Sequence, residues 1–395
     1  MAKISKITPF LIFSYLVLFP LGQIISFRFK LSNFTIPLHP ADFIIFALGL
    51  SYLLNYKKNF SPPAIRIIEF LGVLTFSLVF SLTLFPLNKI LIGFLYLTRL
   101  TFYFLFGLSI ASYARSQEKK KFLIKSLLTI SFFLGLFGLA QYLFWPDFRP
   151  FYVYGWDEHL YRLVGTFLDP SFTGLFLVFG SILSLSFWYK LKKRKYLFLF
   201  FFLTLSLILT YARACYLAYG IGLGYLMIKN KDFKLTLLTL MGFVVILTMI
   251  PFKEGEGVKL TRTKSIFFRL ENYQEALVLV KKSPIFGLGY NNLCVAKEKY
   301  LNKIDLDSHA CSGFDASLLL ILTTGGVVGL TVFFFLVFEF WKNLGIGFES
   351  GVIKVTFISL FIHSLFVNSL FYPWVLGWIF ILLGISGVLI SKKNN

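Results

Sequence analysis

The segment FFRLENYQEALVLVKKSPIFGLGYNNL at residues 267–293 and the segment SHACSGFDASLLLILTTGGVVGL at residues 308–330 carry the chain from a polar region into an apolar one. The first segment predicts an amphipathic helix, because apolar side chains recur at spacings of three and four residues: Ile266, Leu270, Tyr273, Leu277 and Val280. The helix should end at Ser283-Pro284, since proline lacks an amide donor and disfavours helical geometry before it. Gly287 and Gly289 then allow a tight turn.

Arg269 lies beside the apolar stripe of this helix, about 60° from its centre at 100° per residue. We therefore expect the helix to lie along a membrane surface with the stripe down and Arg269 at the boundary between lipid and water. The chain re-enters the apolar phase near Asp315, where the helix that carries Gly326 and Gly329 begins.

Composition places the chain among integral membrane proteins. Hydrophobic residues make up 57% of it, charged residues only 14%, and the mean hydropathy is +0.78. So much apolar surface cannot be hidden in a water-soluble core. The net charge of +21 would suggest a nucleic-acid partner in a soluble domain, but most basic residues lie between apolar segments. The charge therefore reports membrane topology, and no nucleic-acid partner is expected.

Twelve membrane-spanning helices are predicted when about 20 apolar residues are taken as one crossing. The run 196–228 is divided at Arg213, because a charge at the bilayer centre is costly. The loops predicted to lie inside hold 22 lysines and arginines, and the short outer connections hold six, so both termini should be cytoplasmic. We expect one polytopic domain over 1–395, with an external loop at 252–314 between the ninth and tenth spans. The spans are 8–27, 41–56, 67–87, 91–114, 123–145, 165–189, 196–212, 214–228, 235–251, 316–341, 355–373 and 375–391.

The cysteines and carboxylates of the external loop give no metal signature. Cys294 and Cys311 could form a disulfide or remain two free thiols, and neither has zinc-site spacing. The loop carboxylates lack the spacing of a calcium site: Glu254, Glu256, Asp305 and Asp307. We predict no metal and no cofactor.

The order of these features resembles the O-antigen polymerase and O-antigen ligase family of bacterial membrane proteins. The resemblance rests on an arginine, a short helix, a proline, a Gly-x-Gly turn, a polar loop and a helix with Gly-x-x-Gly-Leu. Two earlier patches add to it, RLVGTF at 162–167 followed by Pro170, and TYAR at 210–213. It covers roughly residues 90–390. It implies an all-α, GT-C-like glycosyltransferase fold with about 12 transmembrane helices, and substrates that are sugars carried on polyprenyl diphosphate, transferred at the outer face.

Three arginines that this topology places on the outer face are the candidate diphosphate ligands: Arg162, Arg213 and Arg269. Guanidinium groups bind phosphate oxygens in pairs and remain charged in apolar surroundings, so they can stabilise a departing diphosphate. Each has a structural alternative: an interfacial anchor for Arg213, a solvated helix edge for Arg269 and a loop end for Arg162. Arg99, inside the fourth predicted span, either pairs internally or lines a cavity.

The general base departs from the family pattern. The ligase pattern has a histidine followed by Asn, Ser or Gln, nine residues and Gly-x-x-Gly, and here Asp315 fills the position of that histidine. His309 lies six residues earlier and has a suitable intrinsic pKa, whereas Asp315 would need its pKa raised by burial. We favour Asp315, although an aspartate there is also a good N-cap. Asp169 is a minor candidate, and His159 lacks a supporting pattern.

The resemblance implies an inverting glycosyltransferase of the bacterial cytoplasmic (inner) membrane. The donor would be an oligosaccharide on polyprenyl diphosphate, the acceptor a glycan or glycolipid hydroxyl, and membrane lipids would surround the protein. A polymerase is favoured because the ligase histidine is absent. A ligase acting on a glycolipid or protein, a transporter or flippase for the same lipids, and a scaffold are the alternatives. A transporter should place polar residues near the midplane, whereas here they gather on one face.

Overall fold

The computed structural model describes residues 7–31, 34–55, 60–154, 156–249, 255–303, 311 and 313–391. Fourteen α-helices and one antiparallel hairpin of two strands are found in these ranges. The bounds are α1 Ile7–Leu18, β1 Phe27–Leu31, β2 Phe34–Leu38, α2 Pro40–Leu54, α3 Pro62–Phe80, α4 Leu87–Tyr113, α5 Gln117–Phe144, α6 Pro170–Leu191, α7 Arg194–Ile208, α8 Arg213–Asn230, α9 Phe233–Met249, α10 Lys264–Lys282, α11 Leu293–Leu301, α12 Ser317–Asn343, α13 Phe348–Ser364 and α14 Pro373–Ser386. The hairpin, with Phe27 paired to Leu38, was not predicted.

The helices confirm a multi-pass membrane protein. Five helical segments among the described residues are long and apolar enough to cross a membrane: Pro62–Thr83, Leu87–Tyr113, Gln117–Phe144, Pro170–Leu191 and Ser317–Asn343. Shorter apolar helices accompany them: Ile7–Leu21, Pro40–Leu54, Phe233–Met249 and Pro373–Ser386. Each of the twelve predicted spans overlaps one α-helix, although α1 ends at Leu18 and α13 at Ser364, about nine residues before the predicted ends. Length and composition support five full crossings, so the number of twelve stays a prediction.

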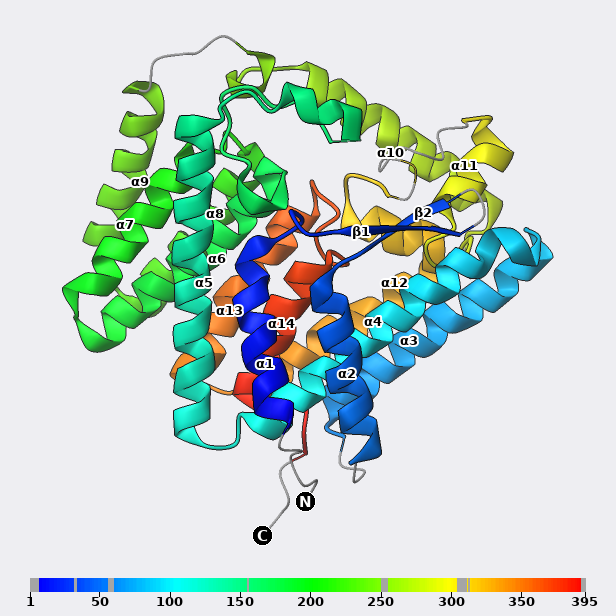
Figure 1. The fold of residues 1–395 in the computed structure, drawn as a ribbon, viewed down its shortest axis with the longest axis horizontal. Coiled ribbons are helices and arrows are strands. Elements are labelled where there is room, and N and C mark those ends of the chain that lie inside the picture. Colours follow the sequence, from blue (N-terminus) through cyan, green and yellow to red (C-terminus); the bar gives the residue numbers. More distant parts are fainter. Residues whose placement is uncertain are drawn as a thin grey trace.

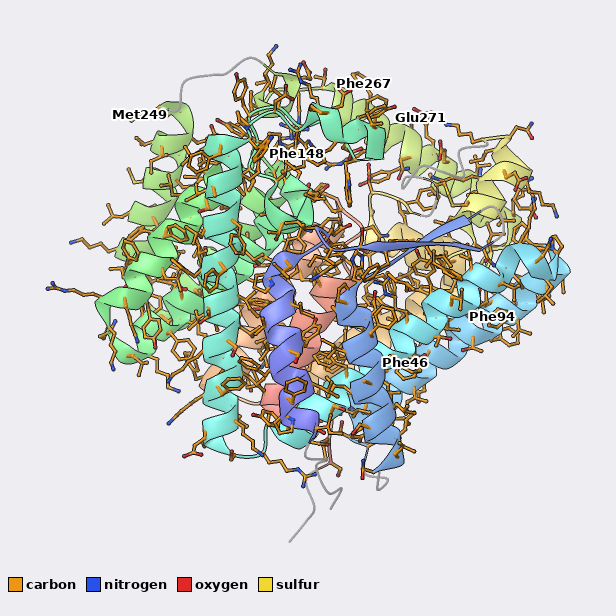
Figure 2. All side chains as sticks on the ribbon, viewed as in Figure 1. Phe46, Phe94, Phe148, Met249, Phe267 and Glu271 are labelled. Atoms are coloured by element: carbon orange, nitrogen blue, oxygen red, sulfur yellow. A yellow bond between two sulfur atoms is a disulfide. The ribbon has the colours of Figure 1, made fainter. Side chains whose placement is uncertain are left out.

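The bundle has two distinct ends. Helix α10 lies across one end, whereas α1 begins and α14 finishes at the other (Figure 1). Large apolar side chains remain exposed along the sides of the helices, as at Phe46 (Figure 2), which is 50% exposed. Such exposure is expected where lipid, not water, surrounds the protein. The bundle end covered by α10 therefore has a different environment from the apolar sides.

Helix α12 is broken at Gly326, whose φ of 66° and ψ of −169° are not helical. The break leaves backbone groups without partners inside the helix, and residues 284–289, which follow α10, pair with them. Four hydrogen bonds join the two segments: Leu288 N to Thr323 O, Gly289 N to Thr324 O, Val327 N to Pro284 O and Val328 N to Ile285 O. Irregular backbone is tolerated at membrane depth only where protein groups satisfy it in this way.

Two glycines make this joint possible. A Cβ atom on Gly326 would lie 2.1 Å from the Ile285 carbonyl oxygen, and one on Gly287 would lie 2.3 Å from the Thr324 carbonyl carbon. Both glycines also have positive φ. The Gly-x-Gly turn and the glycines of α12, which were separate patterns in the sequence, are therefore the two halves of one backbone contact.

Helix α10 presents the predicted apolar stripe to its surroundings and a different face to the protein. The helix ends near Ser283 as expected, and Ile266, Leu270 and Leu277 are 46%, 51% and 53% exposed, as side chains directed at lipid would be. Ala276 and Leu279, on an adjacent face, are buried against the protein. Small and mid-sized side chains on that face allow the close approach of α12, which the periodicity of large apolar residues did not reveal. That the stripe lies on a membrane surface stays a prediction.

Candidate functional site

Four arginines gather beneath and beside α10. Arg162 precedes the short 3-10 helix Gly165–Phe167, Arg213 begins α8, and Arg269 lies in α10. Arg262, which sequence reasoning did not single out, joins them from the segment before α10. Desolvation lowers the pKa of Arg262 to about 10, and the three other arginines add to this by charge repulsion. The structure thus brings the three predicted arginines together and adds a fourth; we call these four residues the arginine cluster.

Arg162 is buried and holds the turn that leads into α8. Its Nε donates to the Thr210 carbonyl at 3.0 Å, and a terminal nitrogen donates to the Tyr211 carbonyl at 3.4 Å. Tyr211 has a positive φ of 50°, which is unfavourable for a non-glycine residue. Arg162 therefore stabilises a strained turn, and its positive charge acts on Arg262.

Arg213 and Arg262 bind backbone of the external segment. Arg213 donates to the carbonyls of Leu260 and Arg262, each at 3.1 Å, and to Ser265 Oγ at 2.6 Å. Arg262 in turn donates to the Gly257, Lys259 and Tyr211 carbonyls. These neutral acceptors orient the guanidinium groups without cancelling their charge.

Arg269 is the least engaged member of the arginine cluster. Its guanidinium carbon lies 6.0 Å from the centre of the Phe366 ring, and it makes no hydrogen bond to another described residue. Among the described residues, none of the four arginines forms an ion pair with a carboxylate. Asp169 and Asp157 act on Arg162, and Asp315 lies near Arg269. No described carboxylate is in direct contact, however, so the four guanidinium groups can still receive a multiply charged anion.

A cavity of about 390 Å³ adjoins the arginine cluster through Asp315, which is near Arg269, and Asp169, which is near Arg162, while none of the four arginines lines it. Asp315 and Asp169 both line it, together with Arg99, His39 and Tyr372. Arg99 also forms a bidentate ion pair with Asp42 at 2.8 and 2.7 Å, which links α4 to the first turn of α2. Both alternatives for Arg99, an internal pair and a cavity wall, are therefore correct.

Asp315 has a free carboxylate at this cavity. Desolvation raises the pKa of Asp315, and the nearby charge of Arg269 opposes the rise. Its backbone amide donates to Asn272 Oδ1 of α10 at 2.8 Å, which fixes the residue beneath that helix. The N-cap interpretation is wrong, because the N-cap of α12 is Ala316 and no side chain caps that helix. Among the described residues, the Asp315 carboxylate accepts no hydrogen bond.

His309 lies outside the described residues. The nearest described feature is the disulfide between Cys294 and Cys311, so the pairing that the sequence left open is present. This bond attaches the chain just before Asp315 to α11, and both cysteines are buried. The disulfide and the Asn272 contact therefore fix the approach to Asp315 from two sides.

Asp169 caps α6, and its Oδ1 accepts from the amides of Ser171 and Phe172 at 2.6 and 2.9 Å. Burial raises the pKa of Asp169, and the neighbouring Asp157 adds to the rise. These bonds explain why an aspartate precedes Pro170. They also turn the rest of the carboxylate toward the cavity that Asp315 lines.

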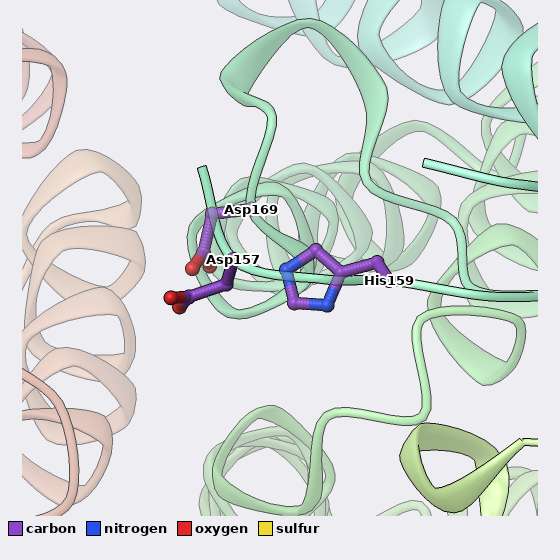
Figure 3. A group of neighbouring side chains, drawn as sticks. All are labelled: Asp157, His159 and Asp169. Carbon is purple, nitrogen blue, oxygen red and sulfur yellow. The ribbon is translucent and has the colours of Figure 1, made fainter. Parts of the chain in front are cut away.

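Asp157, His159 and Asp169 form a group that sequence reasoning missed (Figure 3), with ligand atoms all within 4.8 Å of one another. His159 is 7% exposed, and its Nε2 has no hydrogen-bond partner. Two carboxylates and an imidazole suit a divalent cation. Arg162 and Arg262 oppose one, however, and with burial they lower the pKa of His159 to about 3. No spacing signal marked the group, because the loop folds these residues together. The absence of a metal stays a prediction.

One protein-family model matches part of this chain. A family model described as O-Antigen ligase matches residues 197–334, from α7 into α12. The match includes Arg213, Arg269 and Asp315, and it ends after the break in α12. No curated protein matches the chain.

Proposed function

We propose that this chain is a membrane glycosyltransferase that moves a glycan from polyprenyl diphosphate to an acceptor hydroxyl, a reaction supported by the match of residues 197–334 to the O-antigen ligase family model. The reaction would take place at the outer face of the bacterial cytoplasmic membrane. The observation that carries the proposal is the arginine cluster, whose four positive charges have no carboxylate partner among the described residues. A diphosphate supplies the missing negative charge.

The arginine cluster would bind the donor and stabilise its leaving group. Breaking the bond between the anomeric carbon and the diphosphate oxygen transfers an electron pair to that oxygen, and the new charge is spread over phosphate. A guanidinium and a phosphate oxygen about 4 Å apart gain about 4 kcal/mol at an effective dielectric constant of 20. Arg269 has donors free for this contact, whereas Arg162 and Arg262 add charge while holding the loop.

Asp315 would accept the proton of the acceptor hydroxyl. Its carboxylate is not used by the helix cap, it faces the cavity, and its raised pKa makes it a better proton acceptor than an ordinary aspartate. The deprotonated oxygen attacks the anomeric carbon from the side opposite the diphosphate, so the configuration inverts. Because Arg269 lies near Asp315, stabilisation of the leaving diphosphate and removal of the acceptor proton would occur in one site.

Two observations support the outer face as the location. The charge distribution of the loops favours cytoplasmic termini, and α1 begins and α14 ends opposite α10 (Figure 1). The Cys294–Cys311 disulfide also favours an oxidising compartment for the segment around the site. These features agree, although they depend on different residues.

We favour a polymerase, in which the acceptor is a second lipid-linked glycan. The ligase histidine position holds Asp315, and a ligase acting on a glycolipid or protein is the second candidate. The test is to incubate the purified protein with a lipid-linked oligosaccharide and separate the products. A ladder of lengths supports the polymerase, and single additions to an added glycolipid support the ligase. Movement of the lipid across a vesicle membrane with no product formed would favour the transporter.

A further inference from the structure

A second polar pocket lies at the end of the bundle opposite the arginine cluster. Its volume is about 290 Å³, and it is enclosed by the last turns of α6 and α8 and the first turn of α13. The lining residues that carry the argument are Ser186, Lys190, Lys229 and Gly347. None of these residues contributes to the site of glycan transfer.

The lysines of this pocket, Lys190 and Lys229, and the nearby Lys354 form no ion pair with a carboxylate among the described residues. Asp232 lies near Tyr189, however, and Glu349 lies in the first turn of α13. Lys190 Nζ lies 4.2 Å from the centre of the Phe348 ring. Lys229 Nζ fills the space beside Gly351, where a Cβ atom would lie only 1.4 Å from it. The first turn of α13 thus holds the Lys229 ammonium group beside Gly351 together with its own Glu349, at a helix start whose dipole is positive.

Hydrogen-bond donors in the pocket also lack acceptors. Helix α13 has 17 residues and begins after Gly347, which offers no side chain to cap the first amides. Ser186 is only 5% exposed, and its Oγ has no hydrogen-bond partner. Lysines, uncapped amides and a buried hydroxyl that converge on one space form an anion site.

We propose that this pocket binds the phosphate group of an anionic phospholipid in the membrane leaflet opposite the arginine cluster. A lipid fits better than free phosphate, because exposed apolar side chains border the pocket and offer contact to acyl chains. Leu191, Ile228 and Ile346 are 42%, 68% and fully exposed. Basic pockets between membrane helices are suited to such headgroups. The bound phosphate would join α6, α8 and α13.

The test measures thermal stabilisation of the detergent-purified full chain by short-chain phosphatidylglycerol, with phosphatidylcholine and inorganic phosphate as comparison ligands. We expect phosphatidylglycerol alone to raise the melting temperature. Lys229→Ala should weaken its apparent affinity roughly fivefold, since one lysine near a lipid phosphate contributes about 1 kcal/mol. Gly351→Ala should do the same by displacing the Lys229 ammonium group.

Lys193→Ala is the matched control, because Lys193 is an exposed lysine in the neighbouring α6–α7 connection. It should leave the response to phosphatidylglycerol unchanged, and Lys229→Arg should largely retain it. Equal responses in Lys229→Ala and Lys193→Ala would overturn the site. A response to inorganic phosphate as large as that to the lipid would overturn the lipid as its occupant.

Discussion

At the scale of single residues, the candidate site depends on arginines that form no direct ion pair with a carboxylate among the described residues. Arg213, Arg269 and Asp315 could be found from sequence because the family pattern marks their positions. Arg262 could not, since its importance comes from its place beside the other arginines, 49 residues along the chain from Arg213. Likewise, Asp157 and Asp169 meet only because the intervening loop folds back. Contacts in space between polar residues of a loop leave no periodic trace in the sequence.

Asp315→Asn should lower glycan transfer by roughly a hundredfold, because it removes the proton acceptor. The melting temperature should stay nearly constant, since the carboxylate caps no helix and forms no hydrogen bond to a described residue. Transfer rates and thermal unfolding of the same preparation measure both effects. His309→Gln is the companion variant, and full activity in Asp315→Asn with loss in His309→Gln would assign the base to His309.

The pH dependence of transfer follows from the same carboxylate. The pKa of Asp315 is raised above its ordinary value, so the active carboxylate is present above that raised pKa and is lost as pH falls through it. We expect kcat/KM to decrease on the acid side with an apparent pKa higher than that of a free aspartate. Removing the charge of Arg269 should move this pKa further upward. A kcat/KM that stays constant as the pH is lowered to 4 would contradict the role of Asp315 as the general base.

At the scale of secondary-structure elements, apolar length predicted the helices well, and the apolar periodicity of α10 marks its exposed stripe, whereas the face packed on α12 is made of smaller side chains such as Ala276 that give no such signal. The break in α12 was also invisible, because glycines are common in membrane helices and only the partner segment shows their purpose. The hairpin β1–β2 escaped notice because its strands are short and lie next to apolar spans.

Gly326→Ala and Gly287→Ala should each destabilise the protein by about 3 kcal/mol or more, because the added methyl group would overlap backbone atoms that cannot move independently. Lower melting temperature and lower membrane accumulation are the measurements. Gly220→Ala in α8 is the control, since no heavy atom lies within 4 Å of the added Cβ. Equal behaviour of the three variants would show that the joint contributes little.

At the scale of the whole molecule, the two ends of the bundle differ in chemistry, and the proposed function requires the arginine end to face outward. Cysteine labelling tests this directly in cells, since a membrane-impermeant reagent should modify a cysteine placed at Lys259 and spare one placed at Lys193. The reverse labelling pattern would place the arginine cluster on the cytoplasmic side and contradict glycan transfer at the outer face.

Chelation tests whether the protein uses a metal. Transfer should be unaffected by EDTA, because arginines can stabilise the leaving diphosphate and because Arg162 and Arg262 oppose a cation near His159. A loss of activity that manganese restores, and that His159→Ala abolishes, would assign a metal to Asp157, His159 and Asp169.

The most direct test of the account is the rate of glycan transfer from a polyprenyl diphosphate donor by the purified wild-type protein and by Arg269→Ala and Arg213→Ala. We predict that both variants accumulate normally and lose roughly a hundredfold in rate, about 3 kcal/mol of stabilisation of the departing diphosphate. Lysine at either position should restore little, because one ammonium group cannot replace the planar guanidinium. Near wild-type rates in both alanine variants would contradict a diphosphate site at the arginine cluster.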